Sequence, residues 1–349
     1  MRTIEELVNP HILSLVPYKS ARDDFQGNAD VYIDANESWY ENESSANRYP
    51  DPLARDVRVL LEEKLGLPFS RTVIGNGSDE LIDLLIRIFA EAGKDKILIE
   101  TPTYGAYSVF ASINNVGVLD APLKRDLTLD IEEMKRSINE DRPKLTFICT
   151  PNNPTGKVYS IKEIEEILKI NDGITVVDEA YADFADNFES AISLVDKYPK
   201  LCVMRTLSKA WGIAGARIGI LISDSYIRDL VVKVKPPYNV SVLAQRAAIS
   251  TLKDSDKVKE IRDSVVNMRN SLSKELLSYS FVKEVINGDA NFILVRVDDA
   301  DKLYAYLSKR GIIVRNRTHE RYLEGCLRIT IGSDEEIGKL KEALNGYEG

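Results

Sequence analysis

The sequence has few of the residues on which metal sites and hydrolytic triads depend. It contains two histidines, His11 and His319, so a zinc site or a Ser-His-Asp triad has almost nothing from which to be built. Its three cysteines, Cys149, Cys202 and Cys326, lie far apart in apolar runs, with neither metal-ligand spacing nor a disulfide framework. We expect buried thiols in a reducing compartment, no metal, and acid–base chemistry that uses lysine, tyrosine or carboxylates.

Long apolar runs and an excess of positive charge are also missing. No uncharged apolar stretch reaches the length that spans a bilayer, and residues 1–20 contain acidic side chains and no long apolar core, unlike a signal peptide. The net charge of -9 argues against a nucleic-acid partner, because phosphate backbones require a basic face. A few arginines can still reverse the potential inside one cleft. We therefore expect a cytoplasmic protein with small-molecule substrates and neither a membrane nor a nucleic-acid partner.

The composition that is present suits a folded protein of two parts. The 349 residues are 44% hydrophobic and 29% charged, enough for one large and one smaller core. From about residue 53, segments with helical periodicity, such as 53–66 and 79–93, alternate with short apolar runs. The runs are KILIE (96–100), LTFICT (145–150), ITVVDEA (174–180), LCVMRT (201–206) and RIGILIS (217–223). Their shortness, uniform apolarity and helix-length spacing predict strands buried on both faces of a mostly parallel sheet, and thus an α/β fold.

The pattern changes after about residue 240. A long amphipathic stretch over 240–279 is followed by FVKEVI, NFILVRV, a helix near 300–310, IIVR, CLRITI and a last helix near 334–345. This alternation predicts a smaller α+β domain joined to the large one by a long helix. We expect three parts: an N-terminal arm with a small-domain segment over 1–47, a large domain over 48–240 and a small domain over 241–349.

Polar clusters follow three of the predicted strands. TPNNPTG begins at residue 150, DEAY at 178 and TLSK at 206. In parallel sheets, functional groups collect on the loops beyond the carboxyl ends of the strands. In TLSKAWGIAGAR, Lys209 stands alone after two hydroxyl residues, and the groups able to hold a phosphate around it are Thr206, Ser208 and Arg217. These placements predict a site at one edge of the sheet.

Three further features point to one cofactor. Asp178 ends an apolar strand, where a carboxylate is costly to bury unless a cation such as a pyridinium nitrogen pairs with it. Tyr181 and Asn153 can hydrogen-bond the phenolic oxygen of the same ring. GNGSDE (75–80) is a glycine-rich turn into a helix, whose free N–H groups suit a phosphate. With Lys209 for the aldehyde, these features cover every polar group of pyridoxal phosphate (PLP).

The motifs occur in an order that resembles a known family. They are LVPYKSAR, DANE, NRYP, GNGSDE, TPTYGAYS, TPNNPTG, DEAY, RTLSKAWGIAGARIG and GCLRITIG. From about Tyr18 to the last predicted helix, the chain resembles the fold type I PLP-dependent aminotransferases, and within them the histidinol-phosphate aminotransferases. The resemblance implies a large PLP-binding domain with a mostly parallel sheet flanked by helices, a smaller α+β C-terminal domain and an N-terminal arm.

The resemblance also assigns roles around the cofactor. It implies that Lys209 carries PLP as a Schiff base and then moves the proton, while Asp178 pairs with the ring nitrogen. Tyr104, in TPTYGAYS, is implied to stack on the ring. Asn153 and Tyr181 are implied to bind the phenolic oxygen. The residues implied around the cofactor phosphate are Ser78, Asp79, Thr206, Ser208 and Arg217, joined by Tyr49 from the neighbouring subunit of a homodimer with shared sites.

A second implication is an anion site for the substrate. Arg328, in CLRITIG, matches the arginine that holds the anionic end of the substrate, and Arg315 matches a second arginine typical of the histidinol-phosphate branch. Two guanidinium groups can grip a phosphate dianion, and the glutamate co-substrate can reuse one of them. The further substrate-side positions matched are Tyr18 and Asn36. The neighbours that stay open as alternatives to Arg315 are Arg317 and Arg321.

The implied reaction is ping-pong transamination of L-histidinol phosphate with 2-oxoglutarate, which gives imidazole acetol phosphate and L-glutamate in histidine synthesis. Two other enzymes fit the same site: a threonine-phosphate decarboxylase and an aromatic-amino-acid aminotransferase, in which Arg328 grips a carboxylate. A PLP-binding regulator would need a DNA-binding or partner module, and no basic helix-turn-helix-like extension is present. A dinucleotide-dependent oxidoreductase is disfavoured because GNGSDE lacks the third spaced glycine of that fingerprint.

Overall fold

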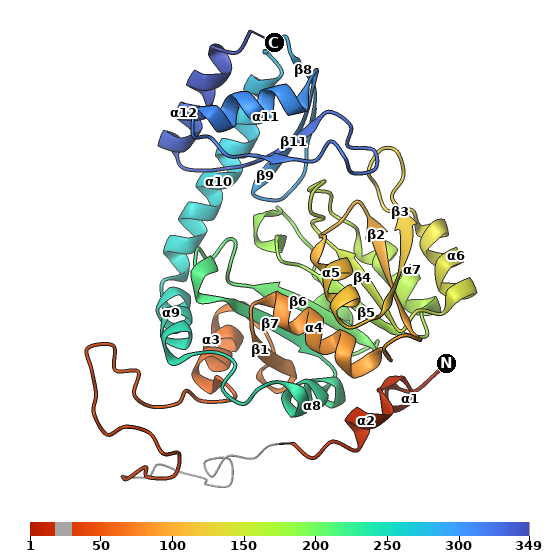
Figure 1. The fold of residues 1–349 in the computed structure, drawn as a ribbon, viewed down its shortest axis with the longest axis vertical. Helices are drawn as coiled ribbons and strands as arrows, with labels where there is room; N and C mark the ends of the chain where they lie inside the picture. Colours follow the sequence, from red (N-terminus) through yellow and green to blue (C-terminus); the bar gives the residue numbers. More distant parts are fainter. Residues whose placement is uncertain (18–29, 349) are drawn as a thin grey trace.

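The computed structural model describes residues 1–17 and 30–348. They form a large α/β unit, a smaller unit above it in Figure 1 and an extended N-terminal segment. The large unit is built around a seven-stranded sheet and the small unit around a four-stranded one. The predicted fold class, α/β with a smaller α+β unit, is confirmed. In the described part of the chain, no helix is both long and apolar enough to cross a membrane.

The large sheet has the strand order β1-β7-β6-β5-β4-β2-β3. Its strands are β1 (Thr72–Asn76), β2 (Lys96–Thr101), β3 (Gly117–Pro122), β4 (Leu145–Cys149), β5 (Ile174–Asp178), β6 (Leu201–Thr206) and β7 (Ile218–Ser223). The strands from β2 to β6 run parallel, whereas β7 is antiparallel to both of its neighbours. Every residue of β4, β5 and β7 is buried, and a strand covered on both faces has no polar side to present, so these segments are apolar throughout.

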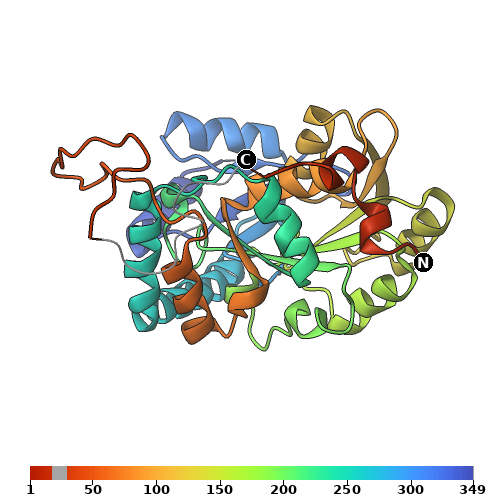
Figure 2. The ribbon, with the colours of Figure 1, turned by 90° about the horizontal axis from the view of Figure 1, so that it is seen from below.

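Helices cover both faces of this sheet (Figures 1 and 2). They are α3 (Arg55–Leu65), α4 (Ser78–Phe89), α5 (Ala106–Ile113), α6 (Ile131–Asp141), α7 (Ile161–Ile170) and α8 (Ser225–Val234), with the 3-10 turns η1 (Phe69–Arg71), η2 (Ala182–Phe184), η3 (Ala191–Leu194) and η4 (Ala214–Ala216) between them. α4 has Asp79 and Glu80 in its first turn, which suits the positive end of the helix dipole. α7 begins with a capping box formed by Ser160 and Glu163. Local sequence signals therefore set where these helices begin.

The small unit follows a break between two helices. The stretch expected as one long helix over 240–279 is α9 (Val242–Lys253) and α10 (Ser255–Leu276), which meet at Asp254. The remaining elements are β8 (Val282–Ile286), β9 (Phe292–Val297), α11 (Ala300–Lys309), β10 (Arg315–Asn316), β11 (Cys326–Thr330) and α12 (Asp334–Asn345). The sheet is antiparallel in the order β10-β11-β9-β8. The strand predicted for IIVR is shorter and later than expected, because β10 is an edge strand with one neighbour to pair with.

The N-terminal segment has two differently packed parts. α1 (Ile4–Leu7) and α2 (Pro10–Leu13) pack on the large unit, where Leu7 and Ile12 join the same core cluster as the apolar face of α4. From residue 30 to about residue 50 the described chain has no helix or strand and loops out from the body of the molecule (Figures 1 and 2). Apolar side chains exposed there include those of Val31, Ile33, Trp39 and Tyr40.

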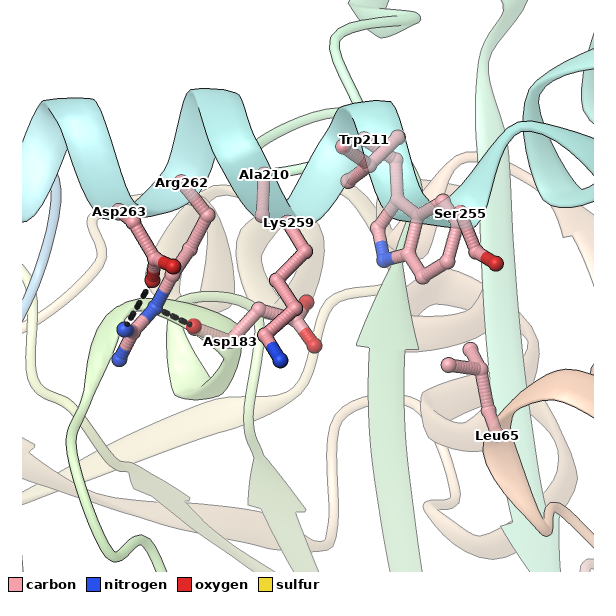
Figure 3. A pocket seen from close by; sticks show the side chains of 9 residues that line it. Leu65, Asp183, Ala210, Trp211, Ser255, Lys259, Arg262 and Asp263 are labelled. Carbon is pink, nitrogen blue, oxygen red and sulfur yellow. Dashed lines mark hydrogen bonds and ion pairs between the residues drawn. The ribbon is translucent and has the colours of Figure 1, made fainter.

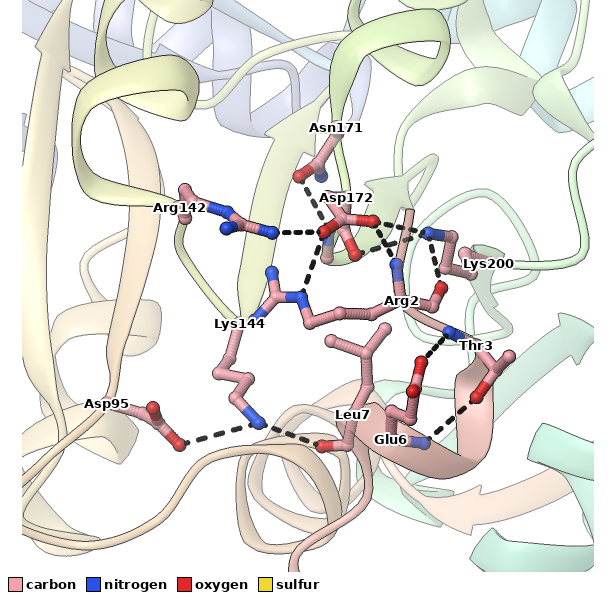
Figure 4. A network of polar contacts seen from close by, with 11 residues as sticks. Arg2, Thr3, Glu6, Leu7, Asp95, Arg142, Lys144, Asn171, Asp172 and Lys200 are labelled. Atoms are coloured by element: carbon pink, nitrogen blue, oxygen red, sulfur yellow. Dashed lines mark hydrogen bonds and ion pairs between the residues drawn. The ribbon is translucent and has the colours of Figure 1, made fainter.

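A cluster of charges fastens the N-terminus to the large unit. Asp172, between α7 and β5, forms ion pairs with Arg142 at 2.7 Å, Arg2 at 3.1 Å and Lys200 at 3.3 Å (Figure 4). It also accepts the backbone N–H of Arg2 at 2.5 Å. Burial raises the pKa of Asp172, but hydrogen bonds from Arg142, Arg2 and Lys200 outweigh it and hold that pKa below its ordinary value. The carboxylate thus stays ionised and joins three segments that are distant in the sequence.

Candidate active site

A pocket opens at the carboxyl ends of β4, β5 and β6, beside the N-terminus of α4. Its lining residues are Ser78, Asp79, Tyr104, Cys149, Asn153, Asp178, Ala180, Tyr181, Thr206, Ser208, Lys209 and Arg217. The cofactor-site residues predicted from the sequence therefore surround one space, with the exception of Tyr49. The volume of this pocket, including the part open to solvent, is about 450 Å³. Parallel strands bring their carboxyl ends to the same edge of a sheet, which is why segments far apart in the sequence meet here.

One end of the pocket suits an anion. Gly77 precedes α4 at φ 80°, and a Cβ at this position would overlap the guanidinium group of Arg217. Arg217 is held by an ion pair of 2.8 Å from its Nη2 to Oδ2 of Asp79. Thr206 accepts a hydrogen bond from the backbone N–H of Ser208 at 3.0 Å. Helix N–H groups and a guanidinium group are typical ligands of a phosphate, and here they face the same space.

Asp178 ends β5 inside the pocket, with 3% of its surface exposed. Its carboxylate accepts hydrogen bonds from the hydroxyl of Tyr107 at 2.7 Å and from the backbone N–H of Ala180 at 3.1 Å. Across residues 1–17 and 30–348, no lysine or arginine forms an ion pair with Asp178. Burial raises the pKa of Asp178 to about 6, although these hydrogen bonds oppose the rise. A buried carboxylate without a cationic partner is destabilising, so a protonated ring nitrogen would fit this place.

Lys209 follows β6 and lines the same pocket, with its side chain accessible from the open cleft. Its Nζ lies 5.4 Å from the centre of the Tyr181 ring. Withdrawal of the amine from water, followed by the positive charge of Arg328, lowers the pKa of Lys209. Because the cleft is open, the surrounding protein removes the amine from water only in part. A lower pKa increases the share of neutral amine, the form that acts as nucleophile or base.

Asn153 links the pocket to the small sheet. Its Nδ2 donates to the hydroxyl of Tyr181 at 3.3 Å, and its Oδ1 accepts a hydrogen bond from Nη1 of Arg328 on β11. Burial raises the pKa of Tyr181 well above its ordinary value, so the phenol stays protonated at neutral pH. An amide and a protonated phenol side by side are donors suited to a phenolate oxygen.

Two arginines lie opposite each other on the small sheet. Arg315 of β10 and Arg328 of β11 are direct partners in the antiparallel register, so their side chains leave the same face. Like charges in such a pair are destabilising by themselves. Arg315 is exposed and, within the described residues, takes part in no ion pair. An anion bound between Arg315 and Arg328 would therefore relieve the repulsion between the two guanidinium groups.

The other two candidate arginines already have carboxylate partners. Arg317 pairs with Glu320 at 2.5 Å, and Arg321 pairs with Asp120 at 3.2 Å. A substrate anion at either residue would compete with an existing ion pair. This difference favours Arg315 among the three positions that the sequence left open.

Four of the predicted site residues that the structure describes are not among those lining this pocket: Tyr49, Asn36, Arg315 and Arg328. Tyr49 is 50% exposed and stacks on Tyr238, with ring centres 4.4 Å apart. Asn36 is exposed on the extended segment, at φ 53°. Tyr18 falls outside the described residues. Within one chain, Tyr49 and Asn36 therefore contribute nothing to the walls of the pocket.

The sequence motifs did not single out Tyr107, although it touches Asp178 directly. Its motif, TPTYGAYS, was interpreted through the first tyrosine, Tyr104, whose hydroxyl donates to Asp79 at 3.1 Å. Tyr107 follows three positions later, at the start of α5, and its backbone N–H donates to the carbonyl oxygen of Tyr104 at 3.3 Å. This short spacing is the signal that could have identified it. Tyr107 therefore belongs to the surroundings of the site even though it does not line the pocket.

A second pocket lies between η2, the start of α10 and the loop after β6 (Figure 3). It contains a polar joint: Arg262 of α10 donates to the backbone oxygens of Asp183 at 2.8 Å and Phe184 at 3.2 Å. An ion pair of 2.6 Å joins Arg262 to Asp186. The joint ties the long helix of the small unit to the turn that directly follows Tyr181.

Comparison with known proteins agrees with this fold. The chain belongs to the aminotransferase class I and II family, whose model matches residues 23–344. Two similar curated relatives are histidinol-phosphate aminotransferases: that of Christiangramia forsetii is 42% identical over 99% of this chain and 98% of its own length, and that of Parabacteroides distasonis is 42% identical over 100% of both. Among solved structures, the histidinol-phosphate aminotransferase from Clostridium acetobutylicum is 28% identical, with a TM-score of 0.78 over 87% of this chain and 91% of that one.

Proposed function

We propose that the protein is a PLP-dependent aminotransferase that moves the amino group of L-histidinol phosphate to 2-oxoglutarate, giving imidazole acetol phosphate and L-glutamate in histidine biosynthesis. The curated relatives, 42% identical over nearly the whole chain, support this assignment. The observation that carries it is that Arg315, which forms no ion pair with any of the described residues, lies directly opposite Arg328, and that Arg328 contacts Asn153 of the pocket. A phosphate dianion matches two guanidinium groups better than a single carboxylate does.

The residues of the pocket fit PLP. Asp178, which forms no ion pair with the described lysines and arginines, would pair with the protonated ring nitrogen, and Arg217 with the N–H groups of α4 would bind the phosphate. Asn153 and Tyr181 would bind the phenolic oxygen, and Lys209 the aldehyde carbon. The other residues proposed around the cofactor are Ser78, Asp79, Tyr104, Thr206 and Ser208. When bound, PLP supplies an electron sink for the negative charge that develops at the substrate Cα.

Lys209 is the proposed base of the reaction. Its lowered pKa leaves more neutral amine at neutral pH, and Nζ can then take the proton from the substrate Cα. Asp178 keeps a negative charge next to the ring nitrogen. Tyr181, held by Asn153, keeps a protonated hydroxyl on the side of the pocket where Lys209 lies.

The substrate anion is proposed to bind between Arg315 and Arg328. The phosphate of histidinol phosphate takes both guanidinium groups, whereas a carboxylate of 2-oxoglutarate or glutamate needs Arg328 alone. Arg317 and Arg321 stay with their carboxylate partners, Glu320 and Asp120. Tyr18 and Asn36 remain proposed contributors to the substrate side.

We further propose a homodimer with shared sites, acting in the cytoplasm on small molecules. Tyr49 is half exposed and outside the pocket of its own chain, as expected of a residue that reaches the cofactor phosphate of a second copy. The apolar side chains exposed on the extended segment after residue 30 suit burial against that copy.

A substrate comparison tests the proposed function. The purified protein with PLP is mixed with histidinol phosphate and 2-oxoglutarate, and glutamate formation is measured. Threonine phosphate with carbon dioxide detection and an aromatic amino acid with 2-oxoglutarate are run in parallel. We expect the highest kcat/KM with histidinol phosphate. Carbon dioxide release from threonine phosphate, or a preference for the aromatic amino acid, would replace the proposal by the corresponding alternative.

A further inference from the structure

Tyr107 is buried behind the pocket and contacts the carboxylate that would face the ring nitrogen of the cofactor. We propose that Tyr107 is a positioning residue: its hydroxyl holds Asp178 as an oriented carboxylate, so that the proton shared with the ring nitrogen of PLP stays on the nitrogen. This inference rests on the proposed function, because it takes Asp178 as the partner of that nitrogen.

The hydroxyl of Tyr107 has a fixed direction. The side chain is 0% exposed, stacks on Phe147 of β4 with ring centres 4.8 Å apart, and meets the ring of Tyr104 edge-on at 5.6 Å. The hydroxyl donates to Oδ2 of Asp178 at 2.7 Å. A close-packed aromatic ring cannot turn away from this position without opening a cavity. The same side chain therefore contacts both the residue proposed to stack on the cofactor ring and the residue proposed to pair with its nitrogen.

The hydrogen bond matters because the surroundings of Asp178 mostly oppose its charge. The ionisable groups that face it from neighbouring elements are Tyr107 of α5, Glu100 of β2, Cys149 of β4, Asp79 of α4, Tyr104, Tyr181 and Lys209. Burial raises the pKa of Glu100 to about 8, so this neighbour is neutral at pH 7 and contributes no charge of either sign. Asp79 raises the pKa of Asp178 as well. Among the contacts that lower the pKa of Asp178, the hydrogen bond from Tyr107 is the strongest.

Toward Asp178, the hydroxyl of Tyr107 acts as a donor. Burial and the charge of Asp178 raise its pKa well above that of a free tyrosine, so it stays protonated. A donor to a carboxylate reduces the affinity of that carboxylate for a proton. When one proton is shared between Asp178 and a ring nitrogen, the less basic carboxylate leaves the proton on the nitrogen. Removing the hydroxyl should move the proton toward Asp178 and weaken the electron sink.

The first arm of the test uses the apoprotein. Tyr107→Phe removes the hydroxyl and keeps the packed ring. Infrared titration of the Asp178 carboxyl band, identified by subtracting the spectrum of Asp178→Asn, gives the pKa of this one group. We expect that pKa to rise by about one to two pH units, the size of one hydrogen bond to a charged group. Tyr159→Phe is the matched control, because Tyr159 is also buried and its hydroxyl has no partner among the described residues.

The second arm uses the holoenzyme. ¹⁵N NMR with ring-labelled PLP reports whether the nitrogen carries the proton. In Tyr107→Phe we expect the resonance to move toward that of unprotonated pyridine, and kcat to fall about 10-fold while KM changes less than about twofold. An unmoved resonance overturns the proposal even when kcat falls, because a packing role changes activity without moving the proton. Tyr159→Phe should match the wild type in resonance and kcat.

If Tyr107→Phe folds poorly, a second variant that is expected to lower the pKa of Asp178 tests the same role. A fluorinated tyrosine at position 107 has a more acidic hydroxyl, which donates more strongly, so the pKa of Asp178 in the apoprotein should fall. An unchanged pKa overturns the role of Tyr107, whatever the substrate of the wild type. Failure of the wild type with histidinol phosphate, combined with the expected shifts, rejects the proposed substrate and leaves the role of Tyr107 standing.

Discussion

The two sides of the cleft are built in different ways. The cofactor side consists of loops after the buried strands β4, β5 and β6 and of the start of α4, so a covered backbone fixes each side chain. The substrate side consists of the two-residue edge strand β10, its neighbour β11 and an exposed extended segment. Under the proposed function, the type of reaction depends on the most buried part of the fold, whereas the choice of substrate depends on its periphery.

The largest loss of activity is expected from a substitution on the cofactor side. Lys209→Ala should lower kcat by at least about 10³-fold, because it removes both the covalent link and the base. PLP should still bind without a covalent bond, since Arg217 and Asp178 remain. Absorption spectra before and after dialysis measure the link, and Lys259→Ala, an exposed lysine of α10, is the control. An absorption band identical to that of the wild type would refute the assignment of Lys209.

On the substrate side the expected effect is smaller and selective. Arg315→Ala should raise the KM for histidinol phosphate about 30-fold, or about 2 kcal/mol, because one charge-assisted contact to the phosphate is lost. The KM for glutamate should change by less than about threefold, since its carboxylate needs Arg328 alone. Arg321→Ala, in which an arginine paired with Asp120 is removed, is the matched control. Equal losses for both substrates would count against phosphate recognition at Arg315.

A mixing experiment tests whether the periphery of one copy completes the site of another. Tyr49→Ala alone should lose about 10-fold in activity if its hydroxyl reaches a cofactor phosphate. When the Tyr49→Ala and Lys209→Ala chains are coexpressed, the mixture should have about one quarter of wild-type activity. Random pairing makes half of the dimers heterodimers, and in each heterodimer one of the two sites has both an intact Lys209 and an intact Tyr49. Activity no higher than the average of the two variants alone would mean that each chain works by itself.

The smallest effect is expected far from the cleft and concerns stability. Asp172→Ala should lower the free energy of unfolding by about 1–3 kcal/mol at pH 7, as expected for lost hydrogen bonds to a charged group. Because the folded pKa of Asp172 lies below the unfolded value near 3.9, its contribution is complete above about pH 5 and is lost as the pH falls through the folded pKa. Urea unfolding at pH 7 and pH 3.5 measures this. Arg142→Ala should lose less, and a loss independent of pH would contradict the charge-based account.

The cofactor side could be predicted from the sequence because its determinants are local. Strands such as LTFIC and ITVVD are apolar throughout because both faces are covered, and the strand-end rule then brings Asp178 and Lys209 to one space. The individual roles of these residues remain predictions. The partner of Tyr107 could not be predicted, since its hydrogen bond spans 71 positions and depends on how α5 packs against β5.

The extent of β10 and the break between α9 and α10 could not be predicted from the sequence, for a related reason. The apolar pattern of IIVR predicts a strand, but a strand at the edge of a sheet extends only as far as its single neighbour pairs with it, here Arg315 and Asn316. The amphipathic pattern over 240–279 continues across Asp254, so periodicity alone does not reveal that two helices meet there. Which arginine is free of carboxylate partners depends on loops that meet only in the folded chain.

The Arg262 joint has a consequence for how the small unit can move. Rotation of a rigid body displaces least the points nearest its pivot. Because Arg262 binds α10 to η2, a tilt of the small unit that preserves these bonds turns about a point beside Tyr181. Displacement would then grow with distance from this joint along α10, toward α12 at the far end of the small unit (Figure 1). A tilt of this kind would leave the turn after Tyr181 nearly still, because that turn is where Arg262 holds α10.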